Sequence, residues 1–173
     1  MGAAIAKELA APFIDADDLH PASNVAKMSR GEPLNDEDRE PWLQIVRERS
    51  QNEALKRSGP VVVGCSALKA AYRDNLRGIS LGRDGLFDRD VEAGKEKVAT
   101  WFVFIKGSRE LLLDRMSKRQ GHFMKVGMLD SQLATLEDPT GEPDVVVVRC
   151  EDGTKRQAEV AREGLRGLHA QLD

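Results

Sequence analysis

The stretch Thr-Trp-Phe-Val-Phe-Ile, residues 100–105, decides the fold class of this 173-residue chain. It is a run of aromatic and β-branched residues without the polar alternation of a half-exposed strand. Comparable apolar runs occur at 60–65 and 144–148, and a shorter one at 12–15. Continuous runs of this kind are typical of parallel strands that are covered on both faces.

Helical patterns separate the four predicted strands. One begins near residues 35–38 and brings Trp42, Ile45 and Val46 to one face, and another follows Ser108. Strands that alternate with helices indicate right-handed βαβ units. We therefore predict an α/β protein.

The ends of the chain are also predicted to be helical. Residues 2–9 have a helical pattern, and Thr154 opens a helix with the Thr-x-x-Gln spacing of a capping box. Residues 78–97 are rich in Gly, Arg, Asp and Glu, which predicts a solvated peripheral insertion. A length of 173 residues favours one domain over 1–173.

Composition excludes several classes of protein. The 26 Lys and Arg against 29 Asp and Glu give a net charge of −3, which argues against wrapping of nucleic acid. No apolar run approaches the ~20 residues of a membrane span, and no secretory signal is visible. Two isolated cysteines, Cys65 and Cys150, predict buried free thiols in a reducing cytoplasm.

The first candidate site follows the strand at 12–15. Asp15, Asp17 and His20 lie just beyond its carboxyl end, where ligands bind in open α/β sheets. Carboxylates there can orient a hydroxyl, accept its proton or hold Mg²⁺ through water. From spacing alone, an ordinary Asp-rich turn remains the alternative.

Two further segments carry charge at predicted helix starts. Residues 31–42 read as a loop followed by an acid-rich first helical turn, which the helix dipole favours. After the strand at 60–65, Ser66 can cap a helix, and Lys69 and Arg73 are four residues apart on one face. Two cations at the carboxyl end of a strand suit an anionic ligand, with ordinary surface charges as the alternative.

A cationic segment follows the strand at 100–105. Between residues 108 and 125, five Lys and Arg oppose two Asp and Glu, and Arg115 and Arg119 share a helix face. A cationic flap of this kind can clamp phosphates. No Gly-x-x-x-x-Gly-Lys-Ser/Thr phosphate loop occurs in the chain.

Taken in order, five segments resemble the gluconokinase family, small P-loop kinases that phosphorylate D-gluconate. The segments are Asp-Ala-Asp-Asp-Leu-His-Pro at 15–21, Asn24 with Lys-Met at 27–28, Gly-Glu-Pro-Leu-Asn-Asp-Glu-Asp-Arg at 31–39 with Pro-Trp-Leu at 41–43, Cys-Ser-Ala-Leu-Lys at 65–69 with Tyr-Arg at 72–73, and Lys-Gly at 106–107 with Arg119 and His-Phe at 122–123.

The resemblance implies transfer of the γ-phosphate of ATP to the 6-hydroxyl of gluconate with Mg²⁺. It implies that Asp17 positions or deprotonates that hydroxyl and that Asp15 holds Mg²⁺ through a water. It assigns residues 106–127 to a lid. The implied gluconate contacts are His20, Lys27, Arg39, Lys69 and Arg73, and the implied nucleotide contacts are Arg115, Arg119, His122 and Lys125.

The resemblance also implies a P-loop kinase-like three-layer sandwich with a mostly parallel sheet. Members of the family are often dimers, so a homodimer is possible. The family begins with a strand and a phosphate loop, and neither occurs in residues 1–173. In the family's strand order 2-3-1-4-5 that first strand is central, so the central strand is expected to be absent. We therefore expect a truncated gluconokinase that binds ATP poorly and turns over little.

Two other hypotheses stay open. One is a non-catalytic relative that keeps a sugar-acid pocket and acts as a regulator. The cationic segment at 106–127 argues against it, because a protein that only binds would not need such a segment. The other is a kinase of the same fold for another hydroxy acid such as shikimate. The segments Leu-His-Pro at 19–21 and Pro-Trp-Leu at 41–43 weigh against it.

Overall fold

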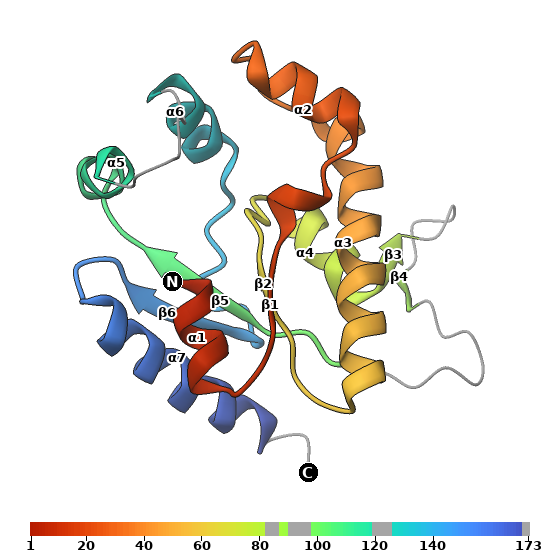
Figure 1. Cartoon of the computed structure of the whole chain (residues 1–173), viewed down its shortest axis with the longest axis vertical. Helices are drawn as coiled ribbons and strands as arrows, with labels where there is room; N and C mark the ends of the chain where they lie inside the picture. Colours follow the sequence, from red (N-terminus) through yellow and green to blue (C-terminus); the bar gives the residue numbers. More distant parts are fainter. Residues whose placement is uncertain (82–86, 90–97, 119–125, 171–173) are drawn as a thin grey trace. The chain divides into compact units, whose positions relative to one another are not determined.

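The computed structural model describes residues 1–81, 87–89, 98–118 and 126–170. The chain divides into two compact units (Figure 1). One unit is the continuous segment 12–100, and the other combines 1–11 with 101–173. All four strands predicted from apolar runs are present, so the α/β prediction is confirmed at the level of the elements.

The unit at 12–100 is built around a parallel strand pair. Strand β1 (Phe13–Asp15) pairs with β2 (Val62–Gly64), with Phe13 opposite Val62 and Asp15 opposite Gly64. Parallel strands need a long crossover, and here it contains helices. The helices and remaining strands of this unit are η1 (Ala16–Leu19, a 3₁₀ turn), α2 (Ala22–Ser29), α3 (Asp36–Arg57), α4 (Ala70–Arg77), β3 (Ile79–Leu81) and β4 (Phe87–Arg89).

Helix α3 has strong signals at both ends. Asn35 is its N-cap and forms a capping box with Asp38, in which each side chain accepts the other residue's backbone N–H at 2.9 Å. Three acidic residues fill the first turn and two basic residues fill the last, which suits the helix dipole. The helix ends at Ser58 in the left-handed conformation, with φ 48°.

One face of α3 forms the core of this unit. Trp42, Leu43 and Val46 are each at most 2% exposed. The expectation that Ile45 shares this buried face is wrong, because Ile45 is 40% exposed. The buried residues are Trp42, Leu43 and Val46, which have the i, i+1 and i+4 spacing of one helix face. Ile45 lies to the side of that face.

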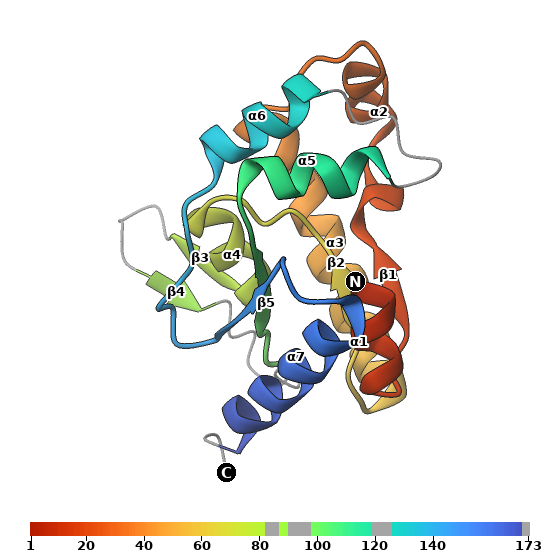
Figure 2. The same ribbon diagram turned by 90° about the vertical axis from the view of Figure 1, so that its left-hand side faces the viewer.

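The segment predicted as a solvated insertion contains a hairpin. Strands β3 and β4 pair antiparallel, with Ser80 opposite Asp88 (Figure 2). Helix α4 ends just before β3 at Gly78, which has φ 78°. An added Cβ at Gly78 would also come within 2.7 Å of the Arg47 guanidinium, so both conformation and space favour glycine.

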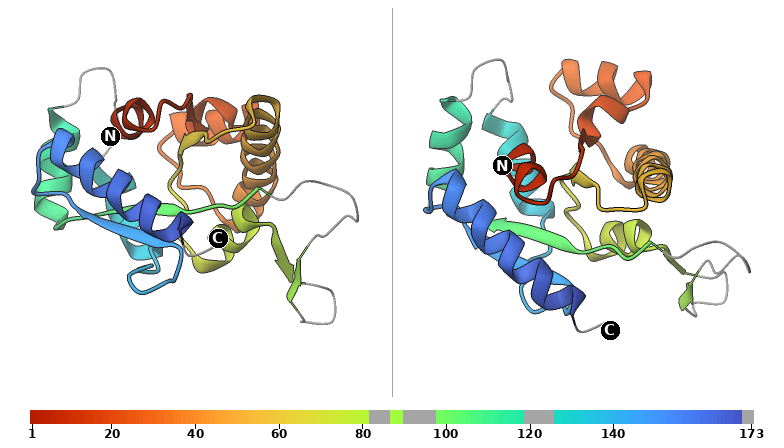
Figure 3. Two further views of the ribbon diagram at one scale, coloured as in Figure 1. Left: turned by 90° about the horizontal axis from the view of Figure 1, so that it is seen from below. Right: turned by 60° about the horizontal axis from the view of Figure 1, so that its bottom comes forward.

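The second unit contains another parallel pair. Strand β5 (Phe102–Lys106) pairs with β6 (Val145–Arg149) over five residues. Its helices are α1 (Gly2–Glu8), α5 (Arg109–Ser117), α6 (Val126–Thr135) and α7 (Thr154–His169). Figure 3 shows α7 lying along the β5–β6 pair. The pairs β1–β2 and β5–β6 match the 2-3 and 4-5 neighbours of the strand order expected from the resemblance.

Helix α7 holds the second unit together on two sides. Gly164 faces β6 so closely that an added Cβ would lie 2.6 Å from a methyl carbon of Val146. On another side α7 packs against α1, and the Arg162 guanidinium donates to the Glu8 carboxylate at 2.9 Å. Ala158 and Ala161 are buried along the helix.

Two predicted caps are wrong. Gly153, not Thr154, is the N-cap of α7, and the Gln157 amide donates to the Arg149 carbonyl at 2.6 Å instead of closing a capping box. Lys69, not Ser66, is the N-cap of α4. Helix α7 does begin at Thr154, as predicted, but without the capping box, whereas α4 begins at Ala70, later than a cap at Ser66 would place it.

Both cysteines are free, as predicted; Cys150 is also buried as predicted, whereas Cys65 is only partly buried. In the part of the chain that the structure describes, no helix combines the length and apolar character that crossing a membrane requires.

Candidate functional site

The turn after β1 holds the first pair of predicted site residues. Asp15 ends the strand, and its carboxylate accepts the backbone N–H of Asp17 at 3.1 Å, which starts the 3₁₀ turn. Ala16 between them is fully buried, and its carbonyl accepts the indole N–H of Trp42 at 2.8 Å. The turn is therefore fixed from inside, while the Asp17 side chain remains 63% exposed. An exposed carboxylate on a fixed turn can receive a ligand hydroxyl.

His20 lies beside this turn. Its ring stacks on Trp42, with centroids 4.2 Å apart and an interplanar angle of 15°. The Asn24 amide nitrogen lies 3.4 Å from Nδ1, and Nε2 lies 4.0 Å from an Asp17 carboxylate oxygen. Burial lowers the pKa of His20, and Asp17 only partly opposes this. A neutral ring that accepts at Nδ1 carries its proton on Nε2, the nitrogen nearest Asp17.

Lys27 is held by the first turn of α3. Its ammonium donates to Asp38 at 2.5 Å, and the same Asp38 oxygen accepts the Asn35 backbone N–H of the capping box. These two donors hold the pKa of Asp38 below its usual value, with Lys27 the larger cause. The Asn24 amide adds a 2.8 Å bond to the Asp38 carbonyl, so α2 and the start of α3 are joined twice.

Lys69 is held by the same turn from the other side. Its ammonium lies 2.7 Å from both carboxylate oxygens of Asp36, and the Tyr72 hydroxyl donates to one of them. The bonds from Lys69 and then Tyr72 lower the pKa of Asp36. The Lys69 ammonium also lies 5.6 Å from the centre of the Tyr72 ring, a cation–π distance.

The two predicted arginine contacts are more deeply placed than the lysines. Arg39 is 8% exposed and donates to the Leu34 carbonyl at 3.3 Å. Arg73 is 2% exposed, and one of its nitrogens donates to the carbonyls of Ala67 and Leu68 at 3.0 and 3.2 Å. Both guanidinium groups therefore brace loops of the unit and supply positive charge from beneath its surface.

Cys65 also lies in this region, at the end of β2. Burial raises the pKa of its thiol to about 11. A thiol with that pKa stays protonated near neutral pH, which argues against a nucleophilic role. Cys65 is best described as a packing residue.

The unit at 12–100 thus contains seven of the predicted site residues. It brings together the Asp15–Asp17 turn, His20, Lys27 and Lys69 around η1, α2 and the first turn of α3. Five residues that take part in these contacts were not predicted as site residues: Asn24, Asp36, Asp38, Trp42 and Tyr72. The acid-rich first turn of α3 was a sequence signal for two of them, although it was interpreted as a response to the helix dipole.

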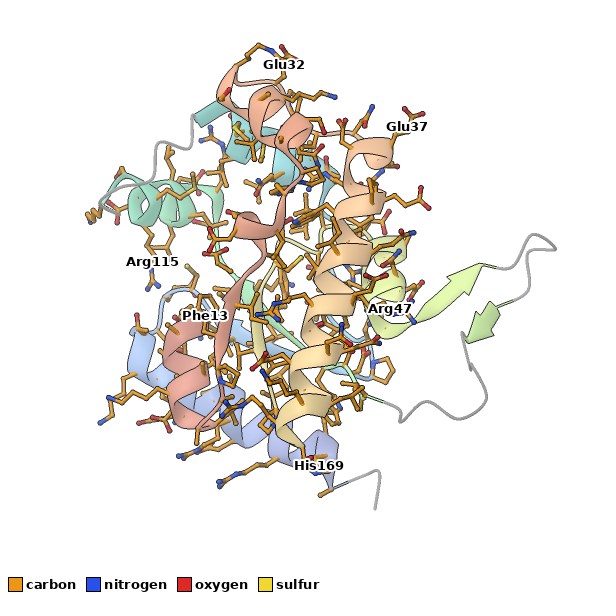
Figure 4. All side chains as sticks on the ribbon, turned by 45° about the vertical axis from the view of Figure 1, so that its right-hand side comes forward. Phe13, Glu32, Glu37, Arg47, Arg115 and His169 are labelled. Carbon is orange, nitrogen blue, oxygen red and sulfur yellow. The ribbon has the colours of Figure 1, made fainter. Side chains whose placement is uncertain are left out.

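Of the predicted nucleotide contacts, only Arg115 lies within the described residues, and it belongs to the other unit. Arg115 on α5 donates to the Asp152 carbonyl at 2.9 Å, and Figure 4 shows its side chain extending from the helix. Arg119, His122 and Lys125 lie outside the described residues. The beginning of α5 is fixed to α6 by a two-bond ion pair between Arg109 and Asp130.

Metal-binding groups are sparse in the described parts of the chain. They contain no cluster of three or more His, Cys, Asp or Glu side chains able to hold an ion. The carboxylates of Asp15 and Asp17 are hard oxygen donors, the kind that Mg²⁺ prefers when it keeps most of its waters. This donor set fits a water-mediated contact and not an all-protein cage.

Comparison with known proteins identifies the class. A gluconokinase crystal structure from Sinorhizobium meliloti 1021 superimposes with a TM-score of 0.71 at 44% identity, covering 98% of this chain and 83% of that one. An unliganded sugar kinase from Janibacter sp. HTCC2649 superimposes with a TM-score of 0.77 at 34% identity, covering 95% and 85%. The chain is therefore an α/β protein with the P-loop kinase-like fold of these sugar kinases, as the sequence predicted.

Curated relatives narrow the class to one family. A probable gluconokinase from Schizosaccharomyces pombe is 39% identical over 161 residues, which are 92% of this chain and 77% of the relative. The thermosensitive gluconokinase of Escherichia coli is 38% identical over 169 residues, 97% of this chain and 81% of the relative. No protein-family model matches the chain. The chain belongs to the gluconokinase family, whose members are phosphotransferases.

Proposed function

We propose that this protein phosphorylates D-gluconate on its 6-hydroxyl, with ATP as the phosphate donor. The observation that supports this most directly is the arrangement around the first turn of α3. An exposed carboxylate, Asp17, lies close to a neutral histidine, while Lys27 and Lys69 are held by carboxylates of the same turn. A polyhydroxylated monoanion needs both a hydroxyl acceptor and cations, and this unit offers both.

In this proposal each side chain has a separate task. Asp17 accepts a hydrogen bond from the reacting hydroxyl and takes its proton as the phosphate is transferred. His20 carries its proton on Nε2, 4.0 Å from Asp17, where it can donate to a substrate hydroxyl bound beside that carboxylate. Lys27 and Lys69 contact the substrate carboxylate and hydroxyls, with Arg39 and Arg73 supplying charge beneath them.

The phosphate side of the reaction depends on groups that the chain would bind. Mg²⁺ supplies neutralisation of the negative charge on the transferred phosphate. Asp15 would hold it through a water, and Asp15 is already fixed by its bond to the Asp17 backbone. Arg115, Arg119, His122 and Lys125 are the proposed nucleotide contacts, within a lid over 106–127. We further propose that the protein is cytoplasmic and can form a homodimer.

Substrate binding and phosphate transfer are tested separately. Because no Gly-x-x-x-x-Gly-Lys-Ser/Thr motif occurs in residues 1–173, we expect slow turnover by this chain. Calorimetric titration without nucleotide, using gluconate, shikimate and glucose, tests the substrate. We expect gluconate to bind and the other two to bind more weakly or not at all. If shikimate bound as tightly as gluconate or more tightly, gluconate would no longer be the proposed substrate and shikimate would take its place.

Transfer is tested by ADP formation with ATP, Mg²⁺ and gluconate. The matched pair is the wild-type chain and Asp17→Asn, which keeps the shape of the side chain but removes the base. We expect a gluconate-dependent rate that Asp17→Asn lowers at least 100-fold, within the range for loss of general-base catalysis. Gluconate binding without ADP formation would assign this chain substrate binding alone.

A further inference from the structure

The carboxylate of Asp36 is the shared partner of two side chains from outside its helix. Both of its oxygens accept from the Lys69 ammonium at 2.7 Å, and one also accepts from the Tyr72 hydroxyl. Lys69 is the N-cap residue of α4 and Tyr72 lies in its first turn. One carboxylate at the start of α3 therefore sets the position of two groups at the start of α4.

Capping of α3 does not explain these contacts. The cap is formed by Asn35 and Asp38, whose side chains and backbone N–H groups satisfy each other. The hydrogen bonds from Lys69 and Tyr72 instead join the Asp36 carboxylate to helix α4, although the Asp36 side chain is 64% exposed. An exposed carboxylate with two directed donors, one of them charged, restricts those donors more than it stabilises its own helix.

The restraint matters most for Lys69, because its side chain is the more flexible of the two partners. A lysine side chain has four rotatable bonds and three N–H donors, and its mobility is lost when it binds a ligand. The Lys69 side chain is only 30% exposed, and Asp36 approaches it with two oxygens. A restraint formed before the ligand arrives reduces the ordering that ligand binding would otherwise require. A lysine has a third N–H donor available for a ligand oxygen.

We propose that Asp36 is a positioning residue for binding of the sugar acid, acting through Lys69 and supported by Tyr72. This inference rests on the proposed function, because it takes Lys69 as a contact to the substrate. It concerns a polyhydroxy monocarboxylate, whose oxygens accept hydrogen bonds from the positioned Lys69 ammonium. Asp36 itself does not touch the substrate in this account.

The test compares Asp36→Asn with Glu37→Gln in the full chain. The first variant keeps an oxygen for Tyr72 but removes the charge that holds Lys69. The second removes an equal charge from the next residue, whose side chain points away from the start of α3 in Figure 4. Calorimetric titration with gluconate should show about tenfold weaker binding for Asp36→Asn, the equivalent of ~1.4 kcal/mol. Glu37→Gln should bind within about twofold of wild type.

Two further variants show whether the effect passes through Lys69. Asp36→Glu keeps the charge and should bind gluconate more tightly than Asp36→Asn. In a Lys69→Met background, Asp36→Asn should cause no additional loss, because the group it positions is gone. An undiminished loss in that background would overturn the inference. Where turnover is measurable, KM for gluconate should rise for Asp36→Asn with kcat within about twofold of wild type.

The outcomes separate this inference from the proposed function. Absence of gluconate binding by the wild-type chain would refute the proposed function. Wild-type binding that Asp36→Asn and Glu37→Gln leave equally intact would refute the positioning role alone. Thermal unfolding of both variants serves as the folding check, and equal midpoints with unequal affinities support the inference.

Discussion

Replacing Trp42 with phenylalanine should destabilise the unit at 12–100 and loosen the turn that carries Asp15 and Asp17. The indole N–H donates to the carbonyl of Ala16 at 2.8 Å, and both residues are at most 1% exposed. Loss of this donor leaves a buried carbonyl without its partner, which costs about 1–3 kcal/mol. The smaller ring also leaves a cavity, which adds roughly 1 kcal/mol. The expected loss in the free energy of unfolding is therefore about 2–4 kcal/mol.

Urea unfolding followed by circular dichroism measures this loss. Trp101→Phe is the matched control, because Trp101 is only partly buried and makes a tilted contact with His169, with centroids 5.7 Å apart. We expect the control to lose less than about 1 kcal/mol, as partly exposed substitutions usually do. A loss below about 1 kcal/mol for Trp42→Phe, or one equal to the control, would refute the claim that this bond fixes the turn.

Three other predictions concern local features. Gly164→Ala should destabilise the protein by about 1–3 kcal/mol, because the new Cβ would lie 2.6 Å from a Val146 methyl. Gly167→Ala is the control in the same helix: its new Cβ meets nothing within 4 Å, so it should stabilise the protein by about 0.5–1 kcal/mol. Thermal unfolding measures both changes. Asn35→Ala should cost about 1 kcal/mol in the same assay through loss of the capping box, and an unchanged midpoint would contradict that. Burial lowers the pKa of His20 below 6.5, so the unfolded chain takes up this proton first as the pH falls. Stability should therefore drop as the pH falls below about 6.5, and a His20→Asn variant should lack that part of the drop.

The strands were predictable because their signal is local. Continuous apolar runs gave β2, β5 and β6 within two residues of their observed ends. The hairpin of β3 and β4 was missed because its three-residue strands lie in a segment dominated by glycine and charge. Strands of three residues are too short to show a periodic pattern in the sequence.

Helix faces were predictable only in part. Spacing of three and four residues assigned Trp42, Ile45 and Val46 to one face. At 100° per residue, the buried residues Trp42, Leu43 and Val46 span a stripe from which Ile45 lies well to one side. The sequence alone does not show which neighbours of a central residue the core covers.

The sequence allowed the residues of the candidate site to be proposed, but not the contacts among them that the structure shows. Asp15, Asp17 and His20 were identified because they follow a strand. The pairing of Asp36 with Lys69 joins residues 33 positions apart, and that of Asp38 with Lys27 joins residues 11 apart. Contacts at such separations are set by packing of the helices, so an acid-rich first turn could be interpreted from sequence only as a response to the dipole.

The ion pair between Glu8 and Arg162 has a consequence for synthesis of the protein. Its partners are 154 residues apart, and the unit they close includes both ends of the described chain. At translation rates of about 5–20 residues per second, α1 leaves the ribosome roughly 8–30 s before its partner helix exists. The continuous segment 12–100 is synthesised within that interval. Until α7 emerges, the apolar side of α1 is an exposed surface that a chaperone can bind.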